Sequence, residues 1–291
     1  MKILYTSDIH TSDNLLSDVL TQSEYHGVDA MIIGGDLIPR QISKSDLPKE
    51  LKAQDLYIEN ILIPQVTRFK EKSESAIYLD LSNFDFSYPR RLLEQHQGKL
   101  YRLLHLQKHP LTQAVDIIGY MTVPPTPFKK KDWEKIDSVD FPYPKGNKVL
   151  LEGVVSDSRG LQDTIIDLAS HGTIESDLTE LEHFIDKPFI FVAHAPPYET
   201  PLDVTGDGQH VGSLSIRRFI EKWSKKSLLL ASLHGHIHES PMVSGSVATR
   251  IHDAISINPG QNHGPDAELR YVLLELLENG APAKVRILWS P

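Results

Sequence analysis

The stretch of the sequence with the most evident chemistry is a cluster of three histidines near its C-terminal end. Residues 233–239 read Leu-His-Gly-His-Ile-His-Glu and directly follow an apolar run at 228–231. In an extended segment, side chains two residues apart point to the same side, so His236 and His238 are expected to converge on one point. Imidazole is the commonest metal-binding side chain, and two of them in register need only a few further donors to hold a metal ion.

Further donors follow two predicted strands near the N-terminus. Residues 2–6 are an apolar run that predicts a buried strand, and this run leads into Asp8 and His10. A predicted helix separates it from a second strand, residues 30–33, which leads into Asp36. A strand–helix–strand order implies a parallel pair whose carboxyl ends meet at one edge of the sheet. The three side chains are therefore expected to lie together at that edge, where open α/β sheets build their sites.

Two more polar residues stand at the ends of predicted strands. Residues 76–81 predict a strand that runs into Asn83, and residues 188–193 predict one that ends at His194. The candidate metal ligands are then Asp8, His10, Asp36, Asn83, His194, His236 and His238. Each of them alone has a structural explanation as a turn residue, a helix cap or a core histidine. Together, at the strand ends of one predicted parallel sheet, they form a mixed oxygen and nitrogen donor set large enough for two metal ions.

The composition is that of an ordinary globular protein. The chain has 291 residues, of which 40% are apolar and 24% charged, and its formal net charge is −9. This acidic balance argues against nucleic-acid binding, which depends on basic surface. The absence of cysteine excludes disulfides and thiolate metal sites. Because no apolar run reaches membrane-spanning length and the N-terminus does not resemble a secretion signal, we expect a soluble, cytoplasmic protein without a membrane partner. Nothing in the sequence indicates the oligomeric state.

The hydrophobic pattern predicts a single α/β domain, residues 1–291, with one insertion. Residues 46–72 predict a long helix that Pro64 kinks. Residues 124–172 are rich in Pro, Gly, Lys and Asp and predict an irregular insertion that covers the sheet edge. Within it, we interpret the lysines at 129–131 as a solvated charged turn rather than a phosphate clamp. Other strands are predicted at 100–106, 114–121, 228–233, 249–257, 270–277 and 284–289, and other helices at 90–97, 173–186 and 213–223.

The ordered set of motifs resembles that of the calcineurin-like metallophosphoesterase family. The family's motifs are Asp-x-His, Gly-Asp, Gly-Asn-His-Asp/Glu, a histidine late in a strand, and Gly-His-x-His. Here they read Asp8-Ile9-His10, Gly35-Asp36, Ser82-Asn83-Phe84-Asp85, His194 and Gly235-His236-Ile237-His238. The resemblance covers residues 8 to 238 and implies a four-layer α/β/β/α sandwich of two mixed sheets, with a dinuclear metal site at the C-terminal ends of strands.

The resemblance also implies how the ligands are shared and what the site does. One metal ion would be held by Asp8, His10 and His238, the other by Asn83, His194 and His236, with Asp36 bridging the two. The implied reaction is hydrolysis of a phosphate ester. Two cations roughly 3.5–4 Å apart activate a bridging water as hydroxide and neutralise charge in an in-line displacement. The mixed donors favour manganese, iron or zinc over magnesium. We expect a small-molecule phosphate ester as substrate, with diesters slightly preferred over monoesters.

One position departs from the family pattern, because Phe84 stands where the family has a histidine assigned to the leaving group. Three interpretations stay open. In the first, His210 supplies the proton from a Gly-rich loop, residues 206–213, that leads into a helix N-terminus favourable to anions; the alternative is that His210 is a loop or capping residue. In the second, the substrate has a good leaving group and needs little acid help. In the third, the protein is a metal-binding regulator with weak or lost catalysis.

Two neighbours of the ligands are predicted to support them. By alternation His234 lies on the same side as His236 and is expected to orient a ligand, and Asp85 is expected to support the loop that carries Asn83. The remaining histidines, His263 among them, have no identifiable partner at a strand end. Residues 258–260 predict a turn close to the site, with no assigned chemistry.

Overall fold

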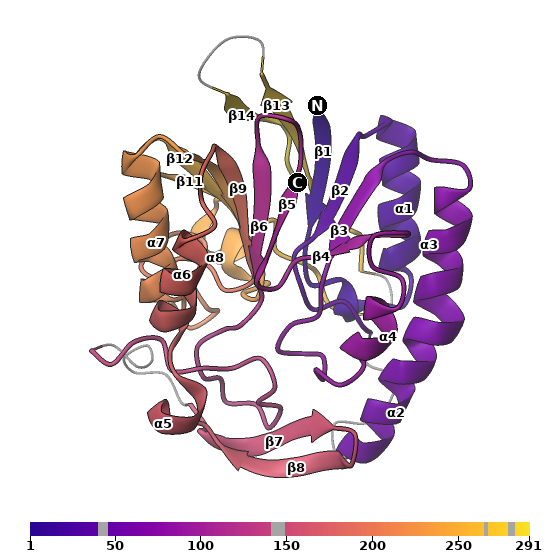
Figure 1. Ribbon diagram of the computed structural model, residues 1–291, viewed down its shortest axis with the longest axis vertical. Helices are drawn as coiled ribbons and strands as arrows, with labels where there is room; N and C mark the ends of the chain where they lie inside the picture. Colours follow the sequence, from indigo (N-terminus) through magenta and orange to yellow (C-terminus); the bar gives the residue numbers. More distant parts are fainter. Residues whose placement is uncertain (40–45, 141–148, 265–266, 279–282) are drawn as a thin grey trace.

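Two mixed sheets that face each other, with helices on their outer sides, form the body of the molecule (Figure 1). The computed structural model describes residues 1–39, 46–140, 149–264, 267–278 and 283–291. Each of the two large sheets has six strands. The α/β/β/α sandwich expected from the sequence is therefore confirmed.

The first sheet has four parallel strands that carry the N-terminal ligands. Its order is β14 (Lys284–Trp289), β13 (Val272–Leu277), β1 (Lys2–Thr6), β2 (Ala30–Ile33), β3 (Ala76–Leu79) and β4 (Arg102–Leu103). β1 to β4 run parallel, whereas β13 pairs antiparallel with both β1 and β14. All four residues of β2 are buried, as expected of a strand covered on both faces.

The second sheet carries the C-terminal ligands on parallel central strands. Its order is β11 (Ala248–Ile251), β12 (Ala254–Ile257), β10 (Leu229–Leu233), β9 (Phe189–Ala193), β6 (Asp116–Tyr120) and β5 (Gln107–Pro110). Only the edge strands β11 and β5 pair antiparallel. The prediction of one strand over residues 249–257 is wrong, because the chain reverses at His252, whose φ is 52°, and forms the β11–β12 hairpin.

The longer helices bury apolar residues against the sheets, whereas the short helix at residues 168–171 has no buried residue. The helices are α1 (Leu15–His26), α2 (Leu47–Tyr57), α3 (Ile63–Lys70), α4 (Arg90–Glu94), α5 (Leu168–His171), α6 (Ile174–Glu182), α7 (Leu214–Lys225) and α8 (Ser240–Ser244). In α7 the buried residues Ile216, Phe219, Ile220 and Trp223 recur at helical spacing and pack with α6 over the second sheet. Figure 1 shows α1 and α3 on the opposite side, over the first sheet. No helix in the described ranges has the length and apolarity to cross a membrane.

The long helix predicted over residues 46–72 is interrupted before Pro64 rather than kinked at it. A π-helical turn, η2 (Ile58–Leu62), joins α2 to α3. Pro64 then lies in the first turn of α3, where a missing N–H group breaks no intrahelical hydrogen bond. The wider turn therefore takes up the disruption that the proline would otherwise cause.

The insertion contains regular structure that its composition did not indicate. β7 (Glu152–Asp157) and β8 (Gly160–Ile165) form a two-stranded sheet at the bottom of the molecule in Figure 1; residues 141–148 of the insertion lie outside the described ranges. The prediction of a solvated turn is wrong for Lys130 and Lys131, which are 6% and 2% exposed. Both ammonium groups are instead paired with buried carboxylates.

Candidate metal centre

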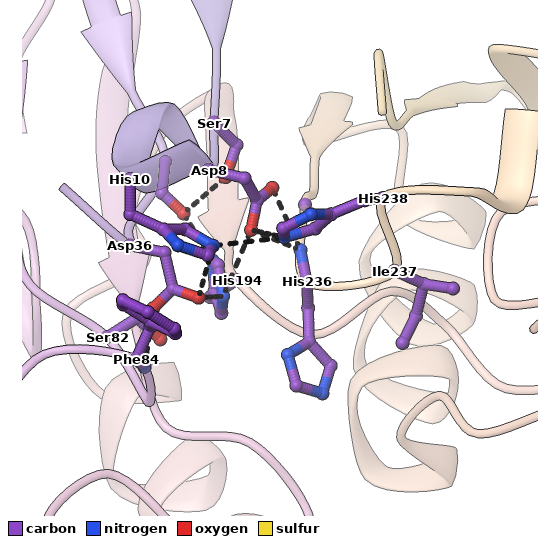
Figure 2. A network of polar contacts seen from close by, with 12 residues as sticks. Ser7, Asp8, His10, Asp36, Ser82, Phe84, His194, His236, Ile237 and His238 are labelled. Carbon is purple, nitrogen blue, oxygen red and sulfur yellow. Dashed lines mark hydrogen bonds and ion pairs between the residues drawn. The ribbon is translucent and has the colours of Figure 1, made fainter. Parts of the chain in front are cut away.

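The seven predicted ligands come from loops that follow strands of both sheets. In the first sheet, β1 leads into Asp8 and His10, β2 into Asp36, and β3 into Asn83. In the second sheet, β9 leads into His194 and β10 into the histidine cluster. The expectation that one parallel sheet carries all of them is therefore wrong. Figure 2 shows the two groups meeting where the strand ends of the two sheets approach each other.

Four of the ligands converge on one point. One ligand atom each from Asp8, His10, Asp36 and His238 lies within 4.8 Å of all the others. The His238 Nε2 atom is 3.1 Å from Asp8 Oδ1 and 3.2 Å from His10 Nε2. The His10 Nε2 atom is 3.8 Å from Asp36 Oδ2. Such a set of carboxylate oxygens and imidazole nitrogens has the chemistry of a transition-metal site.

The other three ligands adjoin this group through Asp36. The His194 Nε2 atom is 3.3 Å from Asp36 Oδ2 and 3.7 Å from Asp8 Oδ1. The ring of His236 lies 5.3 Å from that of His194, centroid to centroid, and Figure 2 shows it pointing away from His238. Within the described part of the chain, the buried Asn83 Oδ1 atom has no hydrogen-bond partner, and the buried His194 Nε2 atom has only the two carboxylates beside it. Because leaving such atoms unpaired is costly, these residues fit a second cation beside the first.

The histidine cluster is a tight turn rather than an extended segment. β10 ends at Leu233, the His236 φ is 67°, and the N–H of Ile237 donates to the carbonyl of Gly235 at 2.7 Å. A Cβ atom on Gly235 would lie 2.1 Å from the Ser7 Oγ atom. Alternation along an extended segment was expected to bring His236 and His238 together, and this explanation is wrong. The turn and the close approach of two backbone segments direct His238 toward Asp8.

Three of the ligands have left-handed backbone conformations. The φ angles are 58° at Asp8, 51° at Asp36 and 67° at His236. Such conformations cost of order 1–3 kcal/mol each and persist where the surroundings hold them. Here the N–H of His236 donates to both Asp8 carboxylate oxygens, at 3.1 and 3.0 Å, and the N–H of Asp8 donates to the carbonyl of Gly35 at 3.1 Å.

His234 supports a loop rather than the His236 side chain. It is fully buried, and its Nδ1 atom lies 2.8 Å from the carbonyl oxygen of Ala193 and 3.0 Å from that of Ala195. These carbonyls flank His194, so the ring fixes the backbone that carries that ligand.

Asp85 connects two of the ligand loops. Its carboxylate accepts the N–H groups of Leu37 at 2.9 Å, Ile38 at 3.1 Å and Ser82 at 3.2 Å. The first two follow Asp36 and the third precedes Asn83. Asp85 therefore holds the loops after β2 and β3 together, which is the kind of support predicted for it.

Two residues that position the predicted ligands had no predicted role. The His263 Nε2 atom lies 2.9 Å from His238 Nδ1, and the two rings stack with centroids 4.6 Å apart. The Asn258 side chain donates to the carbonyls of Gly235 at 3.2 Å and Ile237 at 3.1 Å, which clamps the turn. The Asn-Pro-Gly turn placed Asn258 near the site, but no pattern in the sequence pointed to His263.

The buried carboxylates raise the pKa of some histidines of the site, whereas burial keeps other histidines neutral. Burial raises the pKa of Asp8, but His238 and His194 outweigh burial, so that the pKa falls well below its usual range. Burial alone would lower the pKa of His194, yet Asp36 and Asp8 raise it to about 9. Burial lowers the pKa values of His10 and His236 to about 3 each. These two rings are therefore neutral, the form in which imidazole binds metals.

The ligands open into a cavity of about 580 Å³. Its lining, within the described ranges, consists of His10, Thr11, Asp36, Leu47, Glu50, Asn83, Phe84, Pro127, Phe128, Lys129, Lys130, His236, His238, Glu239 and His263. The Phe84 ring stacks on His10, with centroids 3.8 Å apart and planes 25° apart, and its N–H donates to Asp36 Oδ1 at 2.9 Å. Phe84 therefore positions two ligands, although its side chain has no proton to donate.

The described lining of this cavity does not include His210. Its Nδ1 atom lies 2.7 Å from Asp203 Oδ1. The N-terminus of α7, expected to favour an anion, is already occupied, because the Asp137 carboxylate accepts the N–H groups of Leu214 at 2.8 Å and Ser215 at 3.2 Å. This contradicts the anion-site argument for His210; its role as the acid stays a prediction.

Known proteins share this architecture. A crystal structure superposes on the chain with a TM-score of 0.60 at 13% identity over 99% of both chains. TT1561 of Thermus thermophilus superposes with a TM-score of 0.52 at 14% identity, again over 99% of both chains. At these identities the likeness shows the fold alone.

Sequence comparisons point to a family. The chain is 39% identical to an uncharacterized protein, MJ1162, of Methanocaldococcus jannaschii over 75 residues, which are 25% of this chain and 31% of that protein. The model of the calcineurin-like phosphoesterase family matches residues 1–240, which include all seven predicted ligands. The chain therefore belongs to the calcineurin-like phosphoesterase family.

Proposed function

We propose that the protein is a phosphoesterase that uses two divalent metal ions and cleaves small phosphate esters, diesters in preference to monoesters. The observation that carries the proposal is the convergence of Asp8, His10, Asp36 and His238 within 4.8 Å, beside the buried Asn83 Oδ1 atom, which has no hydrogen-bond partner among the described residues, and the His194 ring. Family membership supports the same chemistry. A cavity of about 580 Å³ has the size of a site for a small molecule.

In this proposal the ligands divide into two sets around Asp36. Asp8, His10 and His238 hold one ion, and Asn83, His194 and His236 hold the other. Asp36 serves both, which its Oδ2 atom supports by lying 3.8 Å from His10 Nε2 and 3.3 Å from His194 Nε2. The mixed nitrogen and oxygen donors suit manganese, iron or zinc.

In this proposal the metal ions and the side chains have different roles. Bound divalent cations supply the activated nucleophile and the charge neutralisation at the phosphoryl group. The chain's own residues hold the ligand geometry: the Gly34 carbonyl accepts from His194 Nδ1 at 2.8 Å and directs Nε2 toward Asp36. Since Phe84 cannot protonate a leaving group, we propose a substrate whose leaving group departs with little acid assistance.

The test is a metal analysis followed by turnover assays. Protein loaded with manganese, iron or zinc should hydrolyse bis(p-nitrophenyl) phosphate, and p-nitrophenyl phosphate more slowly. Asp36→Asn should abolish both activities, because it removes the carboxylate charge that the two sets of ligands share. Metal binding without turnover of either ester would instead identify a metal-binding regulator.

The leaving group separates the two catalytic interpretations. A series of substituted phenyl esters should show a steep dependence of rate on leaving-group pKa. If His210 is the acid, the dependence is shallow and His210→Ala makes it steep. If His210 is a loop residue, held by its contact with Asp203, the substitution leaves the slope unchanged.

A further inference from the structure

The insertion supplies an apolar wall to the metal cavity. Pro127, Phe128 and Lys129 are exposed and line the same cavity as the predicted metal ligands. The Phe128 side chain is 56% exposed. A large exposed aromatic side chain in a cavity is more informative than one on an open surface, because binding sites combine such side chains with a few polar groups.

Lys130, the next residue of the lining after Lys129, carries a positive charge. The Lys130 Nζ atom lies 2.9 Å from Glu50 Oε1 and donates to the carbonyl of Phe84. It also lies 4.1 Å from the centroid of the Phe84 ring. An ammonium group has three donors, and the described contacts of Lys130 use two of them. The ammonium group also lies 5.2 Å from the centroid of the Phe86 ring, so two acceptors and two aromatic rings surround it.

These two features lie next to groups that would attract a phosphate ester. Lys130 contacts Phe84, and Phe84 stacks on the ligand His10. His10 covers one face of the Phe84 ring and Lys130 the other, so the ring separates the ammonium group from a phosphoryl group bound at the metal ligands. A substituent of that phosphoryl group would extend toward Phe128, the exposed ring on the wall.

Resting on the proposed function, we propose that Phe128 forms a subsite that selects phosphate esters with a planar aromatic substituent. The Phe128 ring stacks on the aromatic group, while Lys130 holds the Phe84 ring against His10. Lys130 and Glu50 are then positioning residues, because their ion pair fixes the ammonium group over Phe84. No bond is made or broken in this step.

Calorimetric binding to the manganese-loaded protein tests the aromatic half of the proposal without turnover. Phenylphosphonate and propylphosphonate carry the same charged group and differ in the planar ring. The protein should bind phenylphosphonate about tenfold more tightly, which is about 1.4 kcal/mol and within the range of one aromatic contact. Phe128→Ala should remove this preference. Phe184→Ala is the matched control, because Phe184 is 55% exposed and lies outside the described lining of the cavity.

Lys130→Met tests the positioning of Phe84. It should weaken both phosphonates by a similar factor, about tenfold, because it releases the ring that rests on His10, and it should leave the preference for phenylphosphonate intact. Because it also leaves Glu50 unpaired, Lys130→Met combined with Glu50→Gln provides a variant without the buried charge. Lys131→Met is the control: this neighbouring lysine pairs with Glu134 outside the cavity, so both affinities should be retained.

Failure of this proposal and failure of the proposed function give different results. Hydrolysis of esters without a preference for phenylphosphonate, or with the preference retained in Phe128→Ala, would overturn the subsite and leave the phosphoesterase intact. A preference lost in Phe128→Ala without any hydrolysis would support the subsite in a protein that binds phosphate esters and does not cleave them.

Discussion

The metal-ligand loops and the insertion that faces them are stabilised by different interactions. In the loops, backbone N–H groups donate hydrogen bonds to neighbouring loops. The N–H of His10 donates to the carbonyl of Asp36 at 3.1 Å, and the N–H of His236 donates to the Asp8 carboxylate. In the insertion, buried ion pairs dominate. Lys130 pairs with Glu50 at 2.9 Å, and Lys131 pairs with Glu134 at 2.6 Å.

This difference distinguishes the residues that would hold the metal ions from those that would select the substrate. The ligand loops depend on these contacts and on a few buried side chains, such as Asp85 and Asn258. Buried ion pairs depend on both partners, and removing one of them leaves an uncompensated charge. The exposed Phe128 is therefore the position of the wall where we expect a substitution to alter substrate choice without altering the metal centre.

The largest effect that sharpens this comparison is metal removal. A ligand that binds only the folded state at about a thousandfold excess over its Kd adds about 4 kcal/mol to the free energy of unfolding. For a chain of this size we expect chelation to lower Tm by about 10 °C. Asp36→Asn should lose the response to metal, because it removes the carboxylate shared by both sets of ligands. Differential scanning calorimetry with and without chelator measures both, and an unchanged Tm in the wild-type protein would contradict the metal centre.

The second effect concerns the backbone of the metal site. A Cβ atom at Gly235 would lie 2.1 Å from Ser7 Oγ and 2.3 Å from Asp8 Oδ2. Gly235→Ala should therefore displace the turn that carries His236 and lower metal affinity by about a hundredfold, as for other substitutions next to ligands. Gly206→Ala is the matched control, because no atom lies within 4 Å of its Cβ position. Equal metal affinities in the two variants would show that the close approach is unimportant.

The third effect belongs to the insertion. The Lys131 and Glu134 side chains have no exposed surface, and Lys131 Nζ lies 2.6 Å from Glu134 Oε2. Lys131→Met should lower the free energy of unfolding by about 3 kcal/mol, because Glu134 stays buried without its partner. Metal content and turnover at 25 °C should remain those of the wild type. Denaturant titration and metal analysis test this separation, which a loss of bound metal would refute.

The sequence was sufficient to predict which residues come together, because each of them follows a strand. Asp8, Asp36 and His194 stand within three residues of the ends of β1, β2 and β9, and the two sheets bring these ends together. The reason given for His238 was wrong, because period-two alternation ends with β10 at Leu233. A left-handed residue such as His236 gives no signal of its own when it is not glycine.

The wall could not be predicted, because its contacts join segments far apart in the sequence. Lys130 and Glu50 are separated by 80 positions, and no periodicity relates an irregular insertion to the start of α2. A run of three lysines is normally solvated, so composition pointed away from two buried ion pairs. The contact of His263 with His238 is of the same kind, since it joins two loops.

The smallest effect concerns the contact between the first sheet and the insertion. His105 follows β4, its Nδ1 accepts the N–H of Met121 at 3.0 Å, and its ring meets Trp133 of the insertion with centroids 5.1 Å apart. Burial lowers the pKa of His105 to about 4, against an opposing effect of Asp80; the other charged groups that act on it are Arg90, Asp177 and Lys135.

The sign of the pH dependence follows from that pKa. Between pH 6.5 and 4 the unfolded chain binds a proton at His105 that the folded protein does not, so this residue lowers stability as the pH falls. His105→Asn keeps an acceptor for Met121 and removes the titration. The stability lost on substitution should therefore be about 2 kcal/mol smaller at pH 5 than at pH 7. His183→Asn, at an exposed position, should have the same effect at both pH values. Urea titrations at the two pH values decide the matter, and equal losses for His105→Asn would mean that its ring is solvated and that the insertion does not seal the sheet there.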